Sequence, residues 1–405
     1  MSGNVNMYTS WSRAKVGPGT TITGGLSGTY ESLNNNPTTS GSTINKMGNG
    51  LLPNFLSFSG STRQNDLDVG FTISLQPGSA QNRNLQQVGV VDGTGAASTV
   101  NGANGGLNNR QAFITFGDKS WGSVKMGKDL GIFASDAILN DITLLGVGGA
   151  YAGAAGNTSL GRIGFGYIYA DWKPQIAYTT PNFSGFQATV GISQAFTAYG
   201  SSTAAGGNAV AASNTNASPA YEGKASYSFA ANDVTGKIWV SGISQRVGSL
   251  RTVVGGAVFG NDDSVAYAGD IGANVKVAGF DLTGYYYGGT GIGTTGQFRD
   301  GFGLGTGTNK LEGRDSNGGY VQAKYTLPTK TIAALSWGVS SLDRASGEQA
   351  NTNLVDENSM WNAMLIQPLT KHLNIVAEYS NQQSNNYANQ RATANVGSLG
   401  AILFF

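Results

Sequence analysis

The dominant pattern along the chain is an alternation of apolar and polar residues with a period of two. Between residues 66 and 76 every second residue is Leu, Val, Phe or Ile, and the residues between them are Asp, Thr, Ser, Gln or Gly. The same alternation recurs at residues 186–193, 265–276 and 373–380. Successive side chains of a β-strand point to opposite faces, so each of these segments has one apolar and one polar face. The pattern therefore predicts an all-β chain built from half-buried strands.

The connections between these strands fall into two classes that alternate along the chain. Short turns are expected at residues 62–65, 181–184, 327–330 and 367–372. Long connections rich in Gly, Asn, Ser and Thr are expected at residues 15–53, 77–107, 195–219, 288–315 and 343–357. Short turns at one end and long loops at the other are typical of transmembrane β-barrels. Pairing each short turn with its flanking strands predicts a 16-stranded antiparallel barrel, which is wide enough for an aqueous channel.

Composition supports a barrel with a non-aqueous outer surface. Only 12% of the 405 residues are charged, and 62 are Gly. The charged fraction is about half that of soluble domains, so much of the outer surface is not expected to face water. No apolar stretch reaches the 18 residues typical of a membrane-spanning helix. Because no linker divides the chain, residues 1–405 are predicted to form a single domain.

Aromatic residues gather near the predicted strand ends. In a transmembrane barrel such rings form girdles at the headgroup level. The girdle candidates are Trp172, Tyr178, Phe183, Phe229, residues 285–287 and Trp361.

Charge and motif content exclude several classes of function. A net charge of +1 without a Lys/Arg run gives no basis for a nucleic-acid partner, and the absence of Cys excludes disulfides and thiolate metal sites. The one histidine, His372, falls in a predicted turn without a nucleophile motif nearby, so no hydrolase is expected.

No cofactor is predicted. Asp262 and Asp263 could bind Ca²⁺, but such dispersed loop acids are more often solvated. Residues 1–12 already alternate, so we expect that a signal peptide was removed and that Met1 was added.

Several segments together resemble the trimeric porins of Gram-negative bacteria, in particular those of β-proteobacteria and their relatives. Residues 54–60 with the strand that ends at residue 76 resemble the second and third strands of these porins, and residues 110–117 and 121–129 resemble the fourth and fifth. Residues 178–186 are similar to the turn before the seventh strand. The closing strand, residues 397–405, ends in Phe405 and resembles the signal that the outer-membrane insertion machinery reads.

The resemblance implies a homotrimer in the bacterial outer membrane, surrounded by lipid and lipopolysaccharide, that passes small hydrophilic solutes and ions. It also implies that the third long loop, residues 129–161, folds into the barrel and narrows it. Asp129, Asp136 and Asp141 punctuate an otherwise apolar loop sequence. We expect their carboxylates to face water while apolar side chains such as Leu139 pack against the inner wall. Charges that line a pore set its ion preference.

Basic residues of the opposing wall must come from inward-facing strand positions. Strand parity places Lys125, Lys224, Lys237, Lys276 and Lys324 inside. The predicted wall consists of Lys125, Arg110, Arg63, Arg13 and Lys324, of which Lys125 and Arg110 are favoured because their strands adjoin the loop.

Other readings of the same pattern stay open at this point. A channel with a preference for organic acids or sugars differs from a general porin only in loop chemistry. A barrel that acts as an adhesin or receptor needs no open lumen, and a soluble lectin-like fold shares the strand pattern. For the oligomer, small residues at Gly255, Gly256, Ala257, Gly397 and Ala401 would let barrels approach closely.

Overall fold

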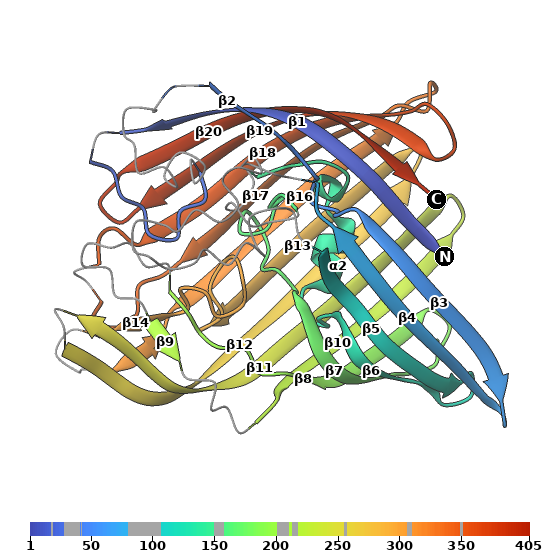
Figure 1. Cartoon of the computed structure of the whole chain (residues 1–405), viewed down its shortest axis with the longest axis horizontal. Helices are drawn as coiled ribbons and strands as arrows, with labels where there is room; N and C mark the ends of the chain where they lie inside the picture. Colours follow the sequence, from blue (N-terminus) through green and yellow to red (C-terminus); the bar gives the residue numbers. More distant parts are fainter. Residues whose placement is uncertain are drawn as a thin grey trace, which may run out of the picture.

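Sixteen long antiparallel strands form the wall of a closed barrel (Figure 1). The structure, a computed structural model, describes residues 1–17, 19–27, 41, 43–79, 107–149, 158–200, 210–212, 218–254, 257–305, 310–348 and 351–405. The wall strands are β1 (Ser2–Val16), β3 (Phe55–Gln64), β4 (Leu67–Pro77), β5 (Leu107–Asp118), β6 (Gly122–Leu130), β7 (Trp172–Thr179), β8 (Phe186–Ser193), β10 (Ala220–Ala231), β11 (Val234–Val254), β12 (Ala257–Val277), β13 (Phe280–Thr290), β16 (Asp315–Thr326), β17 (Ile332–Leu342), β18 (Val355–Pro368), β19 (Leu373–Asn386) and β20 (Arg391–Phe404). The predicted strand number is confirmed.

In the described part of the chain, four short strands accompany this wall. β2 (Thr43–Gly48) pairs with β1, and β9 (Val210–Ala212) pairs with β11. β14 (Phe302–Leu304) and β15 (Leu311–Gly313) form a separate hairpin in the connection between β13 and β16.

The barrel closes through the first and last wall strands. β1 pairs with β20 over the register from Asn4 opposite Phe404 to Val16 opposite Ala392. The backbones of Gly3 and Phe405 exchange two hydrogen bonds of 2.8 and 3.0 Å, so the termini lie side by side (Figure 1). Closure leaves neither strand as an unpaired edge, which would otherwise present free backbone donors and acceptors.

The short turns lie at one end of the barrel, and the strand ends that enter the long connections lie at the other (Figure 1). Asn65 and Asp66 join β3 to β4 with φ angles of 47° and 64°. Two consecutive residues with positive φ form the tight hairpin turn whose twist matches that of the flanking strands. The short turns predicted at residues 181–184, 327–330 and 367–372 also join consecutive wall strands.

The two faces of the wall differ as the alternation predicts. On β1, Val5 and Met7 are exposed on the outer face, whereas Asn4 and Asn6 are buried on the inner face. Among the described residues, no helix has both the length and the hydropathy needed to cross a membrane.

The aromatic girdle is only partly as predicted. Phe183, Tyr286 and Trp361 are exposed on the outer face. Tyr285 and Tyr287 are buried inside the barrel and Trp172 lines an inner cavity, so the assignment of these three residues to the girdle is wrong. For the two tyrosines the physical reason is the period of two, which sends the neighbours of Tyr286 to the opposite face.

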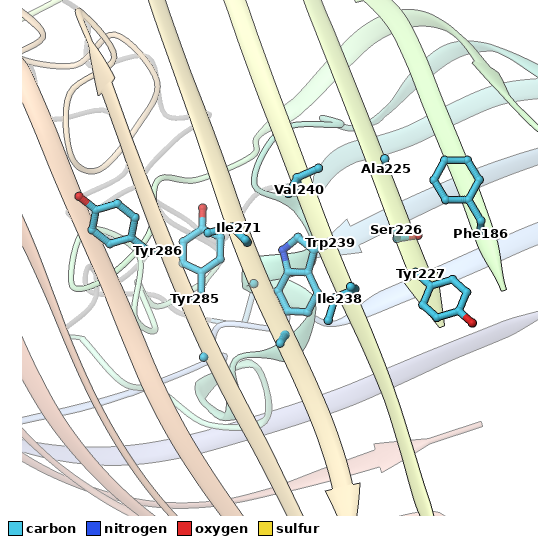
Figure 2. A pocket seen from close by; sticks show the side chains of 13 residues that line it. Phe186, Ala225, Ser226, Tyr227, Ile238, Trp239, Val240, Ile271, Tyr285 and Tyr286 are labelled. Atoms are coloured by element: carbon cyan, nitrogen blue, oxygen red, sulfur yellow. The ribbon is translucent and has the colours of Figure 1, made fainter. Parts of the chain in front are cut away.

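The outer face of β8 to β13 carries an apolar hollow of about 530 Å³ (Figure 2). Phe186, Tyr227 and Tyr286 stand around it (Figure 2), and the lining also includes small residues such as Ala273 and Gly284. Its 13 lining residues include no charged side chain. Such a surface suits contact with hydrocarbon.

Candidate pore constriction

The connection between β6 and β7 lies against the inner face of the wall. Its described parts, residues 131–149 and 158–171, include the short helix α2 (Ser135–Asn140) and the 3₁₀ turn η3 (Ile142–Leu145), and Figure 1 shows α2 within the ring of strands. The Tyr320 hydroxyl on β16 donates to the Ala137 carbonyl at 2.8 Å. The Tyr8 hydroxyl on β1 donates to the Leu145 carbonyl at 2.7 Å. The segment therefore contacts distant parts of the wall.

The boundaries of this segment differ from the prediction. It begins after Leu130 and ends before Trp172, rather than spanning residues 129–161, and residues 150–157 lie outside the described part. Asp129 belongs to β6 and is not a loop residue. Asp129 is four positions from Lys125, so both side chains lie on the same face of this wall strand.

Apolar side chains hold the segment to the wall. Phe133, Ala137 and Ile168 are buried in one cluster with Trp239 and Tyr285 of the inner face. Leu139 differs from the prediction, because its side chain is 59% exposed. An apolar residue of α2 therefore faces the lumen.

A buried carboxylate anchors the start of the segment. Glu222 on β10 accepts hydrogen bonds from the backbone N–H groups of Ile132 and Phe133 at 2.8 and 2.9 Å. The same carboxylate accepts from Lys173 and Ser193, each at 2.7 Å. Because the Lys173 ammonium is completely buried, Glu222 is also the group that compensates its charge.

A second carboxylate anchors the segment beyond η3. Glu378 on β19 accepts from the backbone N–H groups of Val147 and Gly148 at 2.6 and 3.0 Å, and from Asn362 at 2.6 Å. Glu222 and Glu378 thus hold the segment at two separate parts of the wall. Neither contact could be read from strand parity alone, which predicts only that both carboxylates point inward.

Asp141 does not face water, so the expectation of a solvated carboxylate is wrong for this residue. Its side chain is fully buried, 3.7 Å from the Arg162 guanidinium. It accepts from the backbone N–H of Thr143 at 3.0 Å and from the Tyr167 hydroxyl at 2.9 Å. Burial, reinforced by Asp141, raises the pKa of Tyr167 well above its usual value, so this hydroxyl stays protonated and donates. Asp141 therefore caps η3 and compensates Arg162.

Asp136 lies between two lysines of the inner wall. Its carboxylate is 2.8 Å from the Lys224 ammonium on β10 and also binds Lys237 on β11. Burial alone would raise the pKa of Asp136, but the two ammonium groups outweigh it and lower the pKa below its usual value. Only 6% of the Asp136 side chain is exposed, against 22% of Lys224 and 34% of Lys237, so the expectation of a water-facing carboxylate is wrong for Asp136 as well. The lysines therefore present more of the shared site to water than the aspartate does.

Three further lysines that strand parity places inside also pair with aspartates. Lys125 on β6 binds Asp129, which in turn accepts from Gln111 at 3.0 Å. Asp281 on β13 lies 2.9 Å from Lys324 and 3.9 Å from Lys276.

The structure separates the three predicted arginines. Arg63 is on the inner face of β3 and lies within 4 Å of Asp66, Asp68 and Asp118. The Arg110 guanidinium lies 5.8 Å from the Trp172 ring, beside an irregularity in the β4–β5 ladder.

The Arg13 side chain does not line the pore. It shares the exposed face of β1 with Trp11 and donates to the Gly41 carbonyl at 2.8 Å. Its odd parity on β1 places it outside, which corrects the prediction.

A cavity of about 350 Å³ lies between α2 and the inner wall. β5, β6, β7, β8 and β10 contribute wall residues, which include Lys125 and Lys224. Gln175 on β7 also lines this cavity. Its Oε1 is buried and accepts no hydrogen bond from the described residues.

Other predicted functional positions lie away from this cavity. The Phe405 side chain is 51% exposed at the closing seam, and its assembly role stays a prediction. Asp263 lies 2.5 Å from Arg246, and the side chain of Asp262 lies outside the described residues. In the described part of the chain no three His, Asp or Glu side chains are grouped to hold a metal ion. The calcium prediction remains open.

Comparison with known proteins gives one family match. A family model described as Gram-negative porin matches residues 8–388. No curated protein sequence matches the chain.

Solved structures share the fold over the whole chain. The outer membrane channel DcaP of Acinetobacter baumannii is similar with a TM-score of 0.65 and 15% identity, covering 100% of this chain and 96% of that one. An anion-selective porin from Comamonas acidovorans has a TM-score of 0.58 and 13% identity, covering 100% and 98%. The trimer form of OmpT from Vibrio cholerae has a TM-score of 0.51 and 10% identity, covering 100% and 99%.

Proposed function

The chain belongs to the family of Gram-negative porins. We propose that its inner wall and the segment between β6 and β7 form an anion-preferring constriction. The chain is an outer-membrane channel for passive diffusion and is not an enzyme. Family membership sets aside the soluble lectin-like reading and the receptor without a channel. Which solutes the channel prefers depends on the charged side chains of its inner wall.

One observation carries the proposal of anion preference: five inner lysines share three aspartates. Asp129 pairs with one lysine, and Asp136 and Asp281 each pair with two. Five ammonium groups minus the three carboxylates paired with them leaves a charge of +2 on these ion pairs. The inner carboxylates of Asp270 and Glu378 are buried and bound by wall and segment donors. The lysine side chains are 22% to 60% exposed, whereas the aspartates are 6% to 21% exposed. A passing ion therefore meets mainly ammonium groups, which favour anions.

The Arg63 cluster acts in the opposite direction but at a distance. One guanidinium there faces three carboxylates, close to the β3–β4 turn. Arg63 is three strand positions from Lys125, but Asp118 is on β5 beside β6, three residues from Thr115, the register partner of Lys125; even this shorter separation is roughly 11 Å at the usual strand spacing and rise. That exceeds the Debye length of about 10 Å at 0.1 M salt, so the lysines dominate beside α2.

The test is the reversal potential of the reconstituted channel in a KCl gradient. We expect the sign of an anion-preferring pore, and a weaker preference after Lys237→Gln or Lys324→Gln. A cation-preferring wild-type channel, or an unchanged preference in both variants, would refute the proposal.

We further propose that the channel is a homotrimer. The similar OmpT structure is described as a trimer form. Gly397 lies on the face of β20 that Leu399 exposes, and a Cβ built on Gly397 would meet no atom within 4 Å. Such a flat outer surface lets a second barrel approach closely. Gly255 and Gly256, also expected at the contact, lie outside the described residues.

Conductance in triplet steps and a trimer mass in native detergent are the expected results. Unitary steps together with a monomer mass would contradict this assembly.

A further inference from the structure

We propose that the 350 Å³ cavity beside α2 is a binding subsite for small organic monoanions that combine a carboxylate, a hydrogen-bond donor and an apolar body. The inference rests on the proposed anion-preferring constriction and names its class of solute. Three separate features of the lining point to the three parts of such a solute: two lysines, one unpaired amide oxygen and an apolar wall.

The lysines supply the site for the carboxylate. Lys125 on β6 and Lys224 on β10 line the cavity from strands separated by β7 and β8. Their backbones are therefore roughly 14 Å apart at the usual strand spacing, and each flexible four-carbon stem brings its ammonium group into the space between. Both groups are partly exposed, at 31% and 22%.

These ammonium groups retain donors after their internal contacts are made. Each carries three N–H donors. Lys125 donates to Asp129, and Lys224 donates to Ser135 at 3.0 Å and pairs with Asp136. With Lys237, which also binds Asp136, three ammonium groups face two carboxylates, so the local charge is +1. A monoanion neutralises this charge, whereas a neutral sugar leaves it uncompensated.

Gln175 supplies an acceptor. The residue is 5% exposed, and its Nε2 donates to the backbone carbonyls of Asp129 and Leu130 at 3.0 and 2.9 Å. These two bonds fix which end of the amide is the oxygen. The buried Oε1 has no hydrogen-bond partner among the described residues. Buried polar atoms are normally paired, and because Gln175 lines the cavity, a small shift of its side chain would bring this oxygen within reach of a donor on the bound solute.

An apolar wall completes the cavity. Ile132, Leu139 and Trp172 line it, and the Leu139 side chain on α2 is 59% exposed. Inorganic ions gain nothing from such a wall, whereas an aliphatic body buries apolar surface against it. At about 30 Å³ per water-sized group, 350 Å³ accommodates about a dozen heavy atoms. The size suits a short hydroxy acid together with a few waters.

The probe is 3-hydroxybutyrate, which carries a carboxylate, a hydroxyl group and an aliphatic body. We expect it to reduce the single-channel KCl conductance in a saturable manner. Butyrate lacks the donor, and its half-blocking concentration should be about threefold to tenfold higher, as for one lost hydrogen bond. The diol 1,3-butanediol lacks the charge and should not block.

Two variants test the lysines, and a third is the matched control. Lys125→Gln and Lys224→Gln should each raise the half-blocking concentration about fivefold to tenfold, because each removes one charged hydrogen bond at a partly exposed site. Lys371→Gln removes the same charge from the exposed turn between β18 and β19, outside both the cavity lining and the five-lysine wall. It should leave the half-blocking concentration within about twofold.

Failure of the subsite is distinguishable from failure of the proposed function. The subsite is overturned if 3-hydroxybutyrate reduces the conductance without saturation, or if its effect weakens equally in all three lysine variants. This holds even where the KCl reversal potentials show anion preference. Calorimetric titration of the detergent-solubilised trimer with 3-hydroxybutyrate measures binding without any current. Saturable binding that is lost in Lys125→Gln supports the subsite, and its absence overturns it, whichever ion the channel prefers.

Discussion

Replacing Asp136 by Asn tests the electrostatics of the constriction most directly. Asp136 lies on α2 and neutralises Lys224 and Lys237. Asn keeps the shape of the side chain but removes its charge. The variant therefore leaves both lysines uncompensated and adds one positive charge to the lumen. We expect a stronger preference for anions.

The magnitude follows from Coulomb's law with screening. At about 8 Å in a water-like dielectric, one charge changes the energy of a monovalent ion by about 0.5 kcal/mol. Screening reduces this to about 0.4 kcal/mol in 10 mM salt and about 0.2 kcal/mol in 0.1 M salt, where the Debye lengths are about 30 and 10 Å. Anions and cations respond with opposite sign. The ratio of anion to cation permeability should therefore rise about fourfold in 10 mM KCl and about twofold in 0.1 M KCl.

The assay is the reversal potential across a planar bilayer with a KCl gradient, measured in dilute and in concentrated salt. Asp263→Asn is the matched control, because Asp263 forms an exposed ion pair with Arg246 on the other face of the wall. The control should leave the ratio unchanged. An unchanged ratio for Asp136→Asn in dilute salt, in a channel of normal conductance, would show that this carboxylate does not act on passing ions. An equal shift in 1 M salt would also refute the reasoning, since screening should remove it.

The remaining predictions concern the buried part of the segment, pH and the turn histidine. Asp141→Asn leaves the fully buried Arg162 without a counter-charge, so we expect a loss of about 3 kcal/mol of stability, measured by denaturant unfolding in detergent, and a noisier open channel. Because the pKa of Asp136 is lowered in the folded protein, its contribution to stability is present above the unfolded pKa of about 4 and is lost as pH falls further; anion preference should stay constant from pH 7 to 5 and increase only below about pH 4. His372→Gln, in the turn between β18 and β19, should leave liposome swelling rates unchanged, and a large loss in a correctly inserted barrel would contradict the assignment of this turn.

The strands, their faces and their number could be predicted from the sequence because each depends on local information. The side-chain period of a strand is two, so the alternation at residues 265–276 predicts which side chains of β12 face outward. The turn predicted at residues 62–65 lies at Asn65 and Asp66 in the structure, because β3 continues to Gln64. For the same reason Lys125 and Lys324 could be assigned to the inner wall before any tertiary contact was known.

The ion pairs and the path of the inner segment were decided only by the tertiary structure. Asp136 and Asp141 are five positions apart and look equivalent in the sequence, yet one meets two partly exposed lysines and the other is buried against Arg162. Glu222 binds backbone groups 89 and 90 positions earlier in the chain. Such partners depend on barrel closure and on where the loop crosses the lumen. Neither is encoded in the local periodicity, because both arise from contacts between residues that are far apart along the chain.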